Sequence, residues 1–111
     1  MLNMDMLFEK GIFIVRLKGV LNKESCEEID TELSNIIRNN GIKYLLLNLN
    51  DLTYIDEQGV KIILDNYKYI LENKGKMIIC GINKLFEYNA CIAENFYQVN
   101  DEVAAFNLIN I

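Results

Sequence analysis

The sequence predicts a single α/β domain over residues 1–111, with a mixed β-sheet, a leading hairpin and about four helices. Two strand-like segments joined by a glycine turn open the chain, and helix-patterned segments then alternate with apolar, strand-like runs. Half of the residues are apolar (51%), which excludes disorder and lets a chain of this length bury its own core. We therefore expect right-handed βαβ crossovers with helices packed on the sheet.

The first two strands are predicted to form the hairpin. Residues 4–9 alternate weakly between apolar and polar side chains, and the run 12–18 is rich in β-branched residues. Glu9-Lys10-Gly11 lies between them and is typical of a hairpin turn, because Gly11 takes a positive φ without steric cost.

The first helix is predicted from a cap signal and an apolar stripe. Ser25 and Glu28 match the capping-box pattern, so we expect the helix to begin at Ser25. Asn39-Asn40-Gly41 is a typical helix end. Apolar residues at helical spacing form the side that should face the core: Cys26, Ile29, Leu33, Ile36 and Ile37.

The middle of the chain predicts a buried strand, a second helix and another buried strand. The nearly continuous apolar run 44–49 is typical of a central strand covered on both faces, and 77–80 has the same character. Between them, residues 60–71 follow a helical period that ends near 73–75. The predicted core stripe of this helix holds Val60, Ile63, Leu64, Tyr67, Ile70 and Leu71.

The last third of the chain carries weaker signals. We expect a short helix over 84–92, a weak strand over 96–99 and a final helix over 101–108. Gly75 and Gly81 border the strand 77–80 and are interpreted as turn glycines. These elements complete the alternation of helices and strands that the predicted class requires.

Charge and composition exclude several classes of function. The chain has 11 basic and 16 acidic residues, a net charge of −5, which fits neither nucleic acid nor an anionic membrane surface as partner. No apolar stretch approaches the roughly 20 residues that span a bilayer. The first residues lack the features of a signal peptide, so we expect a cytoplasmic protein. We also expect it to be a monomer or weak dimer.

The cysteines indicate packing rather than chemistry. Cys26, Cys80 and Cys91 are odd in number, and none belongs to a CxxC pair. Because the chain has no histidine, they form no recognisable zinc site, and we expect three unpaired thiols in a reducing compartment. The sequence contains no GxGxxG motif and no P-loop, so we do not expect the protein to bind a nucleotide. We expect no other cofactor and no metal ion.

The candidate site is the junction between the central strand and the second helix, residues 54–60. Asp56 should cap this helix and Glu57 should lie in its first turn, where free backbone N–H groups favour negative charge. Two adjacent carboxylates also allow an acid/base reading. Adjacent residues at a helix start point apart, however, and no nucleophile or histidine stands nearby, so we do not expect an enzyme.

A second expectation concerns the far side of the same helix. At 100° per residue, Gln58, Ile62 and Tyr69 fall opposite the predicted core stripe. An isoleucine and a tyrosine two turns apart on an uncovered face favour a protein–protein contact, although a neighbouring element could also cover them. We therefore include them among the expected partner-binding residues.

Several segments resemble the STAS domain of bacterial anti-sigma factor antagonists. The similarity covers roughly residues 10 to 90 and rests on 14–22, 48–56 and 59–68, with 77–80 and Leu85-Phe86 extending it. This resemblance implies a sheet flanked by helices, no catalysis, and binding of a serine-kinase-type anti-sigma factor, which releases the sigma factor. It also implies a phospho-switch at the serine that follows the aspartate of an Asp-Ser-Ser/Thr-Gly motif.

The chain departs from the family at this motif. Asp56 and Gly59 agree with it, but Glu57 occupies the phosphoserine position and Gln58 the next one. Glu57 has no hydroxyl to phosphorylate, so it either mimics the phosphorylated state or marks a switch that has been given up. In the family's Gly-x-Leu-Asp segment, Asn22 replaces the acid and keeps its capping ability.

Two functions follow from these features. The first is a protein-interaction module in transcription regulation by partner switching, binding a kinase-type anti-sigma factor. The alternative is a phosphorylation-independent STAS scaffold subunit of another complex, for example one associated with a transporter. The residues that we expect to bind the partner are Asn22, Asp56, Glu57, Gln58, Gly59, Ile62 and Tyr69.

Overall fold

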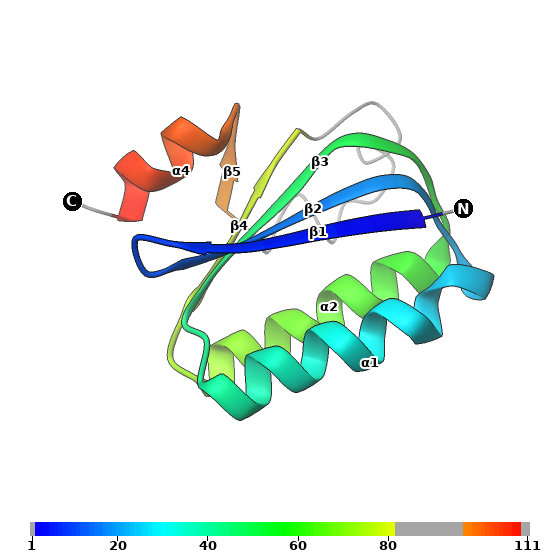
Figure 1. Cartoon of the computed structure of the whole chain (residues 1–111), viewed down its shortest axis with the longest axis horizontal. Coiled ribbons are helices and arrows are strands. Elements are labelled where there is room, and N and C mark those ends of the chain that lie inside the picture. Colours follow the sequence, from blue (N-terminus) through cyan, green and yellow to red (C-terminus); the bar gives the residue numbers. More distant parts are fainter. Residues whose placement is uncertain (1, 82–96, 110–111) are drawn as a thin grey trace.

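A five-stranded mixed sheet forms the centre of the molecule (Figure 1). The structure is a computed structural model that describes residues 2–81 and 97–109. The strands follow one another across the sheet in chain order, β1 pairing antiparallel with β2 and the others parallel. They are β1 (Leu2–Glu9), β2 (Ile12–Leu21), β3 (Tyr44–Ile55), β4 (Lys76–Cys80) and β5 (Tyr97–Val99).

Helices cover both faces of the sheet (Figure 1). The long helices α1 (Lys23–Asn40) and α2 (Glu57–Glu72) pack on one face, and the short α4 (Glu102–Ile109) packs on the other. The predicted mixed sheet with its leading hairpin is confirmed. The described residues hold three helices rather than about four, and the helix expected over 84–92 lies outside them.

The alternation of side chains along the central strands explains why they are apolar throughout. On β2, Phe13 and Val15 enter the core beneath α1 and α2, whereas Ile12 and Ile14 enter the smaller core beneath α4. Each of these four side chains is at most 5% exposed. Successive side chains of a strand point to opposite faces of the sheet. Because helices cover both faces here, the side chains on both sides are buried, and the strand sequence is apolar at nearly every position.

A polar cluster fixes the start of α4 to the sheet. The Nε and Nη2 atoms of Arg16 on β2 each lie 2.8 Å from a carboxylate oxygen of Glu102. Asn48 on β3 donates to the same carboxylate at 2.7 Å. These donors, Arg16 first, hold the pKa of Glu102 below its usual value, so the carboxylate stays charged and the helix start stays anchored.

The first helix begins earlier than its sequence signal predicts. Lys23 is its first residue and Asn22 is its N-cap, so the expected start at Ser25 with a Ser25–Glu28 capping box is wrong. Ser25 instead accepts from the backbone N–H of Asn22 and is therefore the third helical residue of the box. Strand β2 ends at Leu21, which brings the carboxamide of Asn22 into the cap position first.

The outer side of α2 is also different from the predicted one. Ile62 is only 7% exposed and Tyr69 is half-buried with its ring 4.9 Å from the Arg38 guanidinium, so neither lies on an uncovered face. Leu71, which was assigned to the core stripe, is 49% exposed. The alternative that a neighbouring element covers this face is the one observed, because α1 packs along α2.

Cys26 and Cys80 are buried free thiols, as expected for small apolar residues of the core. Burial raises the pKa of both, that of Cys80 to about 11, so both thiols remain protonated near neutral pH. Cys91 lies outside the described residues. In residues 2–81 and 97–109, none of the helices combines the length and apolar character needed to cross a membrane.

Candidate functional site: the paired helix starts

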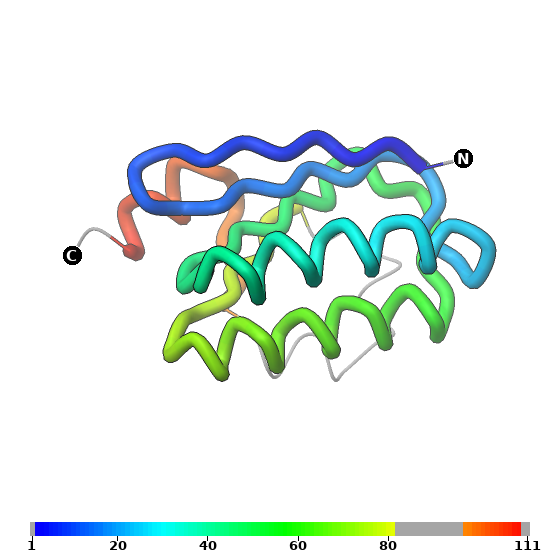
Figure 2. Tube along the Cα trace, turned by 60° about the horizontal axis from the view of Figure 1, so that its bottom comes forward, coloured from blue at the N-terminus to red at the C-terminus, as the bar shows by residue number. Residues whose placement is uncertain are grey.

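Two helices begin side by side at one end of the sheet. Strands β2 and β3 are parallel neighbours, and their last residues, Leu21 and Ile55, are paired in register. Helix α1 follows β2 and helix α2 follows β3, so the two helices start next to each other. Figure 2 shows both starts on the side of the molecule where the N-terminus is marked. We call residues 22–25 and 56–59 the paired helix starts.

Asp56 joins the two starts through a single carboxylate. Its Oδ1 accepts from the backbone N–H of Gly59 at 2.9 Å, the capping bond of α2. Its Oδ2 accepts from the backbone N–H of Lys23, the first residue of α1, at 3.0 Å. The backbone N–H of Asp56 also donates to the carbonyl of Leu21. One negative charge thus satisfies donors of two helix N-termini, each of which favours it electrostatically.

Asn22 and Ser25 complete the start of α1 within its own chain segment. The side-chain oxygen of Asn22 accepts from the backbone N–H groups of Glu24 and Ser25, at 3.0 and 3.1 Å. The hydroxyl of Ser25 accepts from the backbone N–H of Asn22 and donates to the carbonyl of Val20. Cap and strand end are therefore held as one unit.

Gly59 permits the first turn of α2 to lie against the end of β2. A Cβ atom at this position would stand 2.7 Å from both the carbonyl oxygen of Leu21 and the Cγ1 atom of Ile55. The carbonyl belongs to the backbone and cannot rotate away. A larger residue would separate the helix from the strand and so disturb the alignment of the two starts.

Glu57 and Gln58 face solvent on this fixed platform. Both are exposed and both belong to the first turn of α2. Within the described part of the chain, no hydrogen bond or ion pair engages either side chain. Tyr54, next to the junction on β3, is 49% exposed. The site therefore presents a carboxylate, an amide and an aromatic ring to an approaching protein.

The structure brings together five of the seven expected site residues. Asn22, Asp56, Glu57, Gln58 and Gly59 all belong to the paired helix starts. The two others, Ile62 and Tyr69, lie against α1 and contribute to the core. Sequence reasoning missed the bond from Lys23 to Asp56. Two apolar runs, each followed at once by a capped helix, were the signal that could have predicted it.

The two carboxylates of the site have different surroundings. Asp56 already accepts two backbone donors, and Glu57 has no histidine, thiol or hydroxyl beside it in the helix turn that it occupies. Among residues 2–81 and 97–109, the His, Cys, Asp and Glu side chains form no group of three able to hold a metal ion. What the site offers is a rigid, exposed surface with fixed negative charge.

Comparison with known proteins identifies the family. Residues 3–87 match the model of the STAS domain. The chain belongs to the STAS domain family. Among curated relatives, the "Anti-sigma F factor antagonist" of Paenibacillus polymyxa is 29% identical over 82 residues, which are 74% of this chain and 70% of that protein.

Solved structures show the same fold. The anti-sigma factor antagonist SpoIIAA in its unphosphorylated form superposes with a TM-score of 0.82 at 16% identity, covering 97% of this chain and 98% of that one. An anti-sigma factor antagonist from Mycobacterium paratuberculosis reaches 0.86 at 10% identity, covering 100% and 96%. The chain is thus an STAS domain with the architecture of anti-sigma factor antagonists.

Proposed function

We propose that this protein is an anti-sigma factor antagonist that binds a serine-kinase-type anti-sigma factor through the paired helix starts. The observation that carries the proposal is the bridging carboxylate of Asp56, which holds both helix starts as one surface and sets Glu57 on its exposed rim. A partner that docks here meets a preorganised surface, so binding costs little conformational entropy. The role is non-catalytic.

Glu57 gives this antagonist a carboxylate at the position where the resemblance to anti-sigma factor antagonists implies a phosphorylatable serine. A carboxylate at the first turn of α2 lies where the helix N-terminus favours negative charge. Phosphoserine carries about −1.5 to −2 charge and three acceptor oxygens. Glutamate therefore reproduces only part of its negative charge and of its hydrogen-bonding capacity. We infer that the protein binds its partner constitutively and more weakly than an unphosphorylated serine variant would.

The test is the change Glu57→Ser, measured as binding to a candidate anti-sigma factor with and without ATP. The Glu57→Ser variant should bind the anti-sigma factor roughly tenfold more tightly than the wild-type protein, because the negative charge of Glu57 no longer opposes the partner. With ATP and an active kinase it should take up one phosphate, seen by mass spectrometry, and lose that gain. Adding Asn22→Asp should restore more of the switch, since it returns the family's acid beside the bridging carboxylate.

Two control variants separate charge from phosphorylation. Glu57→Gln removes the charge without supplying a hydroxyl, so it should gain affinity but ignore ATP. Gln58→Ser places a hydroxyl one residue further along the same exposed turn and should take up no phosphate, which shows whether phosphorylation is specific for position 57. If Glu57→Ser binds no more tightly and takes up no phosphate, partner switching at this site is refuted.

A second function is favoured by one observation, the exposed Glu57 itself. A side chain without a hydroxyl suits an STAS scaffold subunit that assembles without phosphorylation control, for example beside a transporter. Under this alternative, Glu57→Ser and wild type bind their partner equally, and no kinase-type anti-sigma factor forms a complex with either protein.

A further inference from the structure

A groove opens between the edge strand β1 and the helix α1. It shares Asn22, Glu24 and Ser25 with the paired helix starts, and neither Asp56 nor Glu57 lines it. Its volume is about 510 Å³. Its apolar side chains are Leu2, Met4, Val20 and Ile29, and its acidic side chains are Glu24, Glu28 and Glu32. Of the residues that the structure describes, no basic one lines the groove. The groove therefore combines apolar side chains with three carboxylates.

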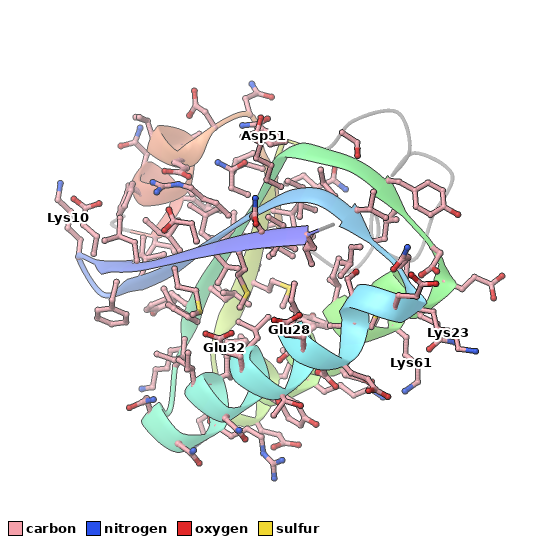
Figure 3. The ribbon with its side chains drawn as sticks, turned by 45° about the vertical axis from the view of Figure 1, so that its right-hand side comes forward. Lys10, Lys23, Glu28, Glu32, Asp51 and Lys61 are labelled. Atoms are coloured by element: carbon pink, nitrogen blue, oxygen red, sulfur yellow. The ribbon has the colours of Figure 1, made fainter. Side chains whose placement is uncertain are left out.

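The three glutamates form a row along α1. They are four residues apart, so each lies one helical turn beyond the last, and all three are exposed. Figure 3 shows Glu28 and Glu32 pointing from α1 toward β1. Within the described residues none of the three forms an ion pair. Like charges at this spacing destabilise a helix slightly, and a cation in the groove would relieve that repulsion.

Strand β1 adds an open hydrogen-bonding edge to the same groove. It pairs with β2 on one side and is the outermost strand of the described sheet. Figures 1 and 2 both show β1 and α1 running alongside each other. An extended segment that paired with this edge would continue the sheet beyond β1, and every second side chain would point to the α1 side.

The spacing of the glutamates matches such a segment. A rise of four helical residues is about 6 Å, and alternate side chains of an extended chain are about 6.6 Å apart. Basic side chains at every second position would thus meet Glu24, Glu28 and Glu32 in turn. A second copy of this chain is a poor occupant, because it would bring the same three carboxylates to the same edge.

We propose that the groove formed by β1 and α1 binds an extended basic segment of a protein partner, with lysine or arginine at alternate positions. The segment adds a strand to β1 by its backbone and pairs its basic side chains with the glutamate row. The groove borders the surface of the proposed function and shares Asn22, Glu24 and Ser25 with it, but the inference needs neither an anti-sigma factor nor a phosphorylated residue.

The experiment uses a fluorescent peptide of five Lys-Thr repeats and the full-length protein. Anisotropy should show binding at low salt that weakens as salt rises, and a peptide of Glu-Thr repeats should not bind. In amide NMR spectra, the Lys-Thr peptide should shift β1 and the α1 residues 24–32. The triple change Glu24→Gln, Glu28→Gln, Glu32→Gln should weaken binding roughly tenfold.

The matched control removes three negative charges that do not line the groove, at the exposed residues Glu27, Asp51 and Glu72. It should bind as wild type does. The groove variant should remain folded, since it loses like-charge repulsion along α1. The proposal would be overturned if the Lys-Thr peptide did not bind, or if both variants lost the same amount of peptide affinity. It would also be overturned if the NMR shifts fell outside β1 and α1, or if the protein self-associated through β1. The anti-sigma factor assay is independent of all four outcomes.

Discussion

The starts of α1 and α2 are built from the same parts but are held in different ways. Each follows a parallel strand, and each has a side-chain cap in the first position after that strand. Asn22 and Ser25 cap α1 with bonds that stay within residues 20–25. Asp56 caps α2 but also bonds to Lys23 of the other helix.

This difference assigns unequal roles to the two junctions. The cap of α1 serves one helix, whereas the cap of α2 fixes the position of one helix start relative to the other. Loss of the first should weaken α1 alone, and loss of the second should loosen the whole surface. The three predictions below test this asymmetry through urea unfolding, which is suited to a domain of this size.

The largest effect is expected for Gly59→Ala. The added Cβ would lie within 3 Å of a backbone carbonyl and of the Ile55 side chain, so we expect a loss of about 3 kcal/mol in the free energy of unfolding. Gln58→Ala, one residue earlier and exposed, should stay within about 0.5 kcal/mol of wild type. Equal stability of the two variants would show that α2 does not need glycine to approach β2.

A smaller effect is expected for Asp56→Ala. Two backbone donors lose their acceptor, so the free energy of unfolding should fall by about 2 kcal/mol. Asp56→Asn keeps one acceptor oxygen and should lose about half as much. Hydrogen exchange should quicken at both Gly59 and Lys23 in the alanine variant. An unchanged rate at Lys23 would contradict the bridge.

The smallest effect is expected for Asn22→Ala, about 1 kcal/mol. The amides of Glu24 and Ser25 lose their acceptor, while Asp56 continues to hold Lys23 and Gly59. Exchange at Glu24 and Ser25 should therefore quicken, and exchange at Gly59 should not. Asn22→Ser, which retains a capping oxygen, serves as the control and should lie close to wild type. Faster exchange at Gly59 would mean that the two starts depend on each other equally.

The order of the elements could be predicted from sequence because it depends on local pattern. The hairpin, the apolar runs and the cap of α2 by Asp56 each rest on a few neighbouring residues. The N-cap of α1 was predicted three residues too late, at Ser25 instead of Asn22, because both residues have capping side chains. Only the end of β2 decides between them.

The contacts between helices could not be predicted in the same way. A helical wheel describes one apolar side, but α2 packs against both the sheet and α1, so Ile62 is buried and Leu71 is exposed. The bond from Asp56 to Lys23 joins residues 33 positions apart, and it exists because β2 and β3 are adjacent. The groove depends likewise on which strand forms the edge of the sheet.

The central claim is that the paired helix starts are the surface that binds the partner. Hydrogen exchange of the wild-type protein, alone and with a serine-kinase-type anti-sigma factor, tests it most directly. We predict slower exchange at residues 22–25 and 56–59 in the complex, with α4 on the opposite face of the sheet unchanged. A complex that protects α4 and leaves the paired helix starts as they are in the free protein would contradict the account.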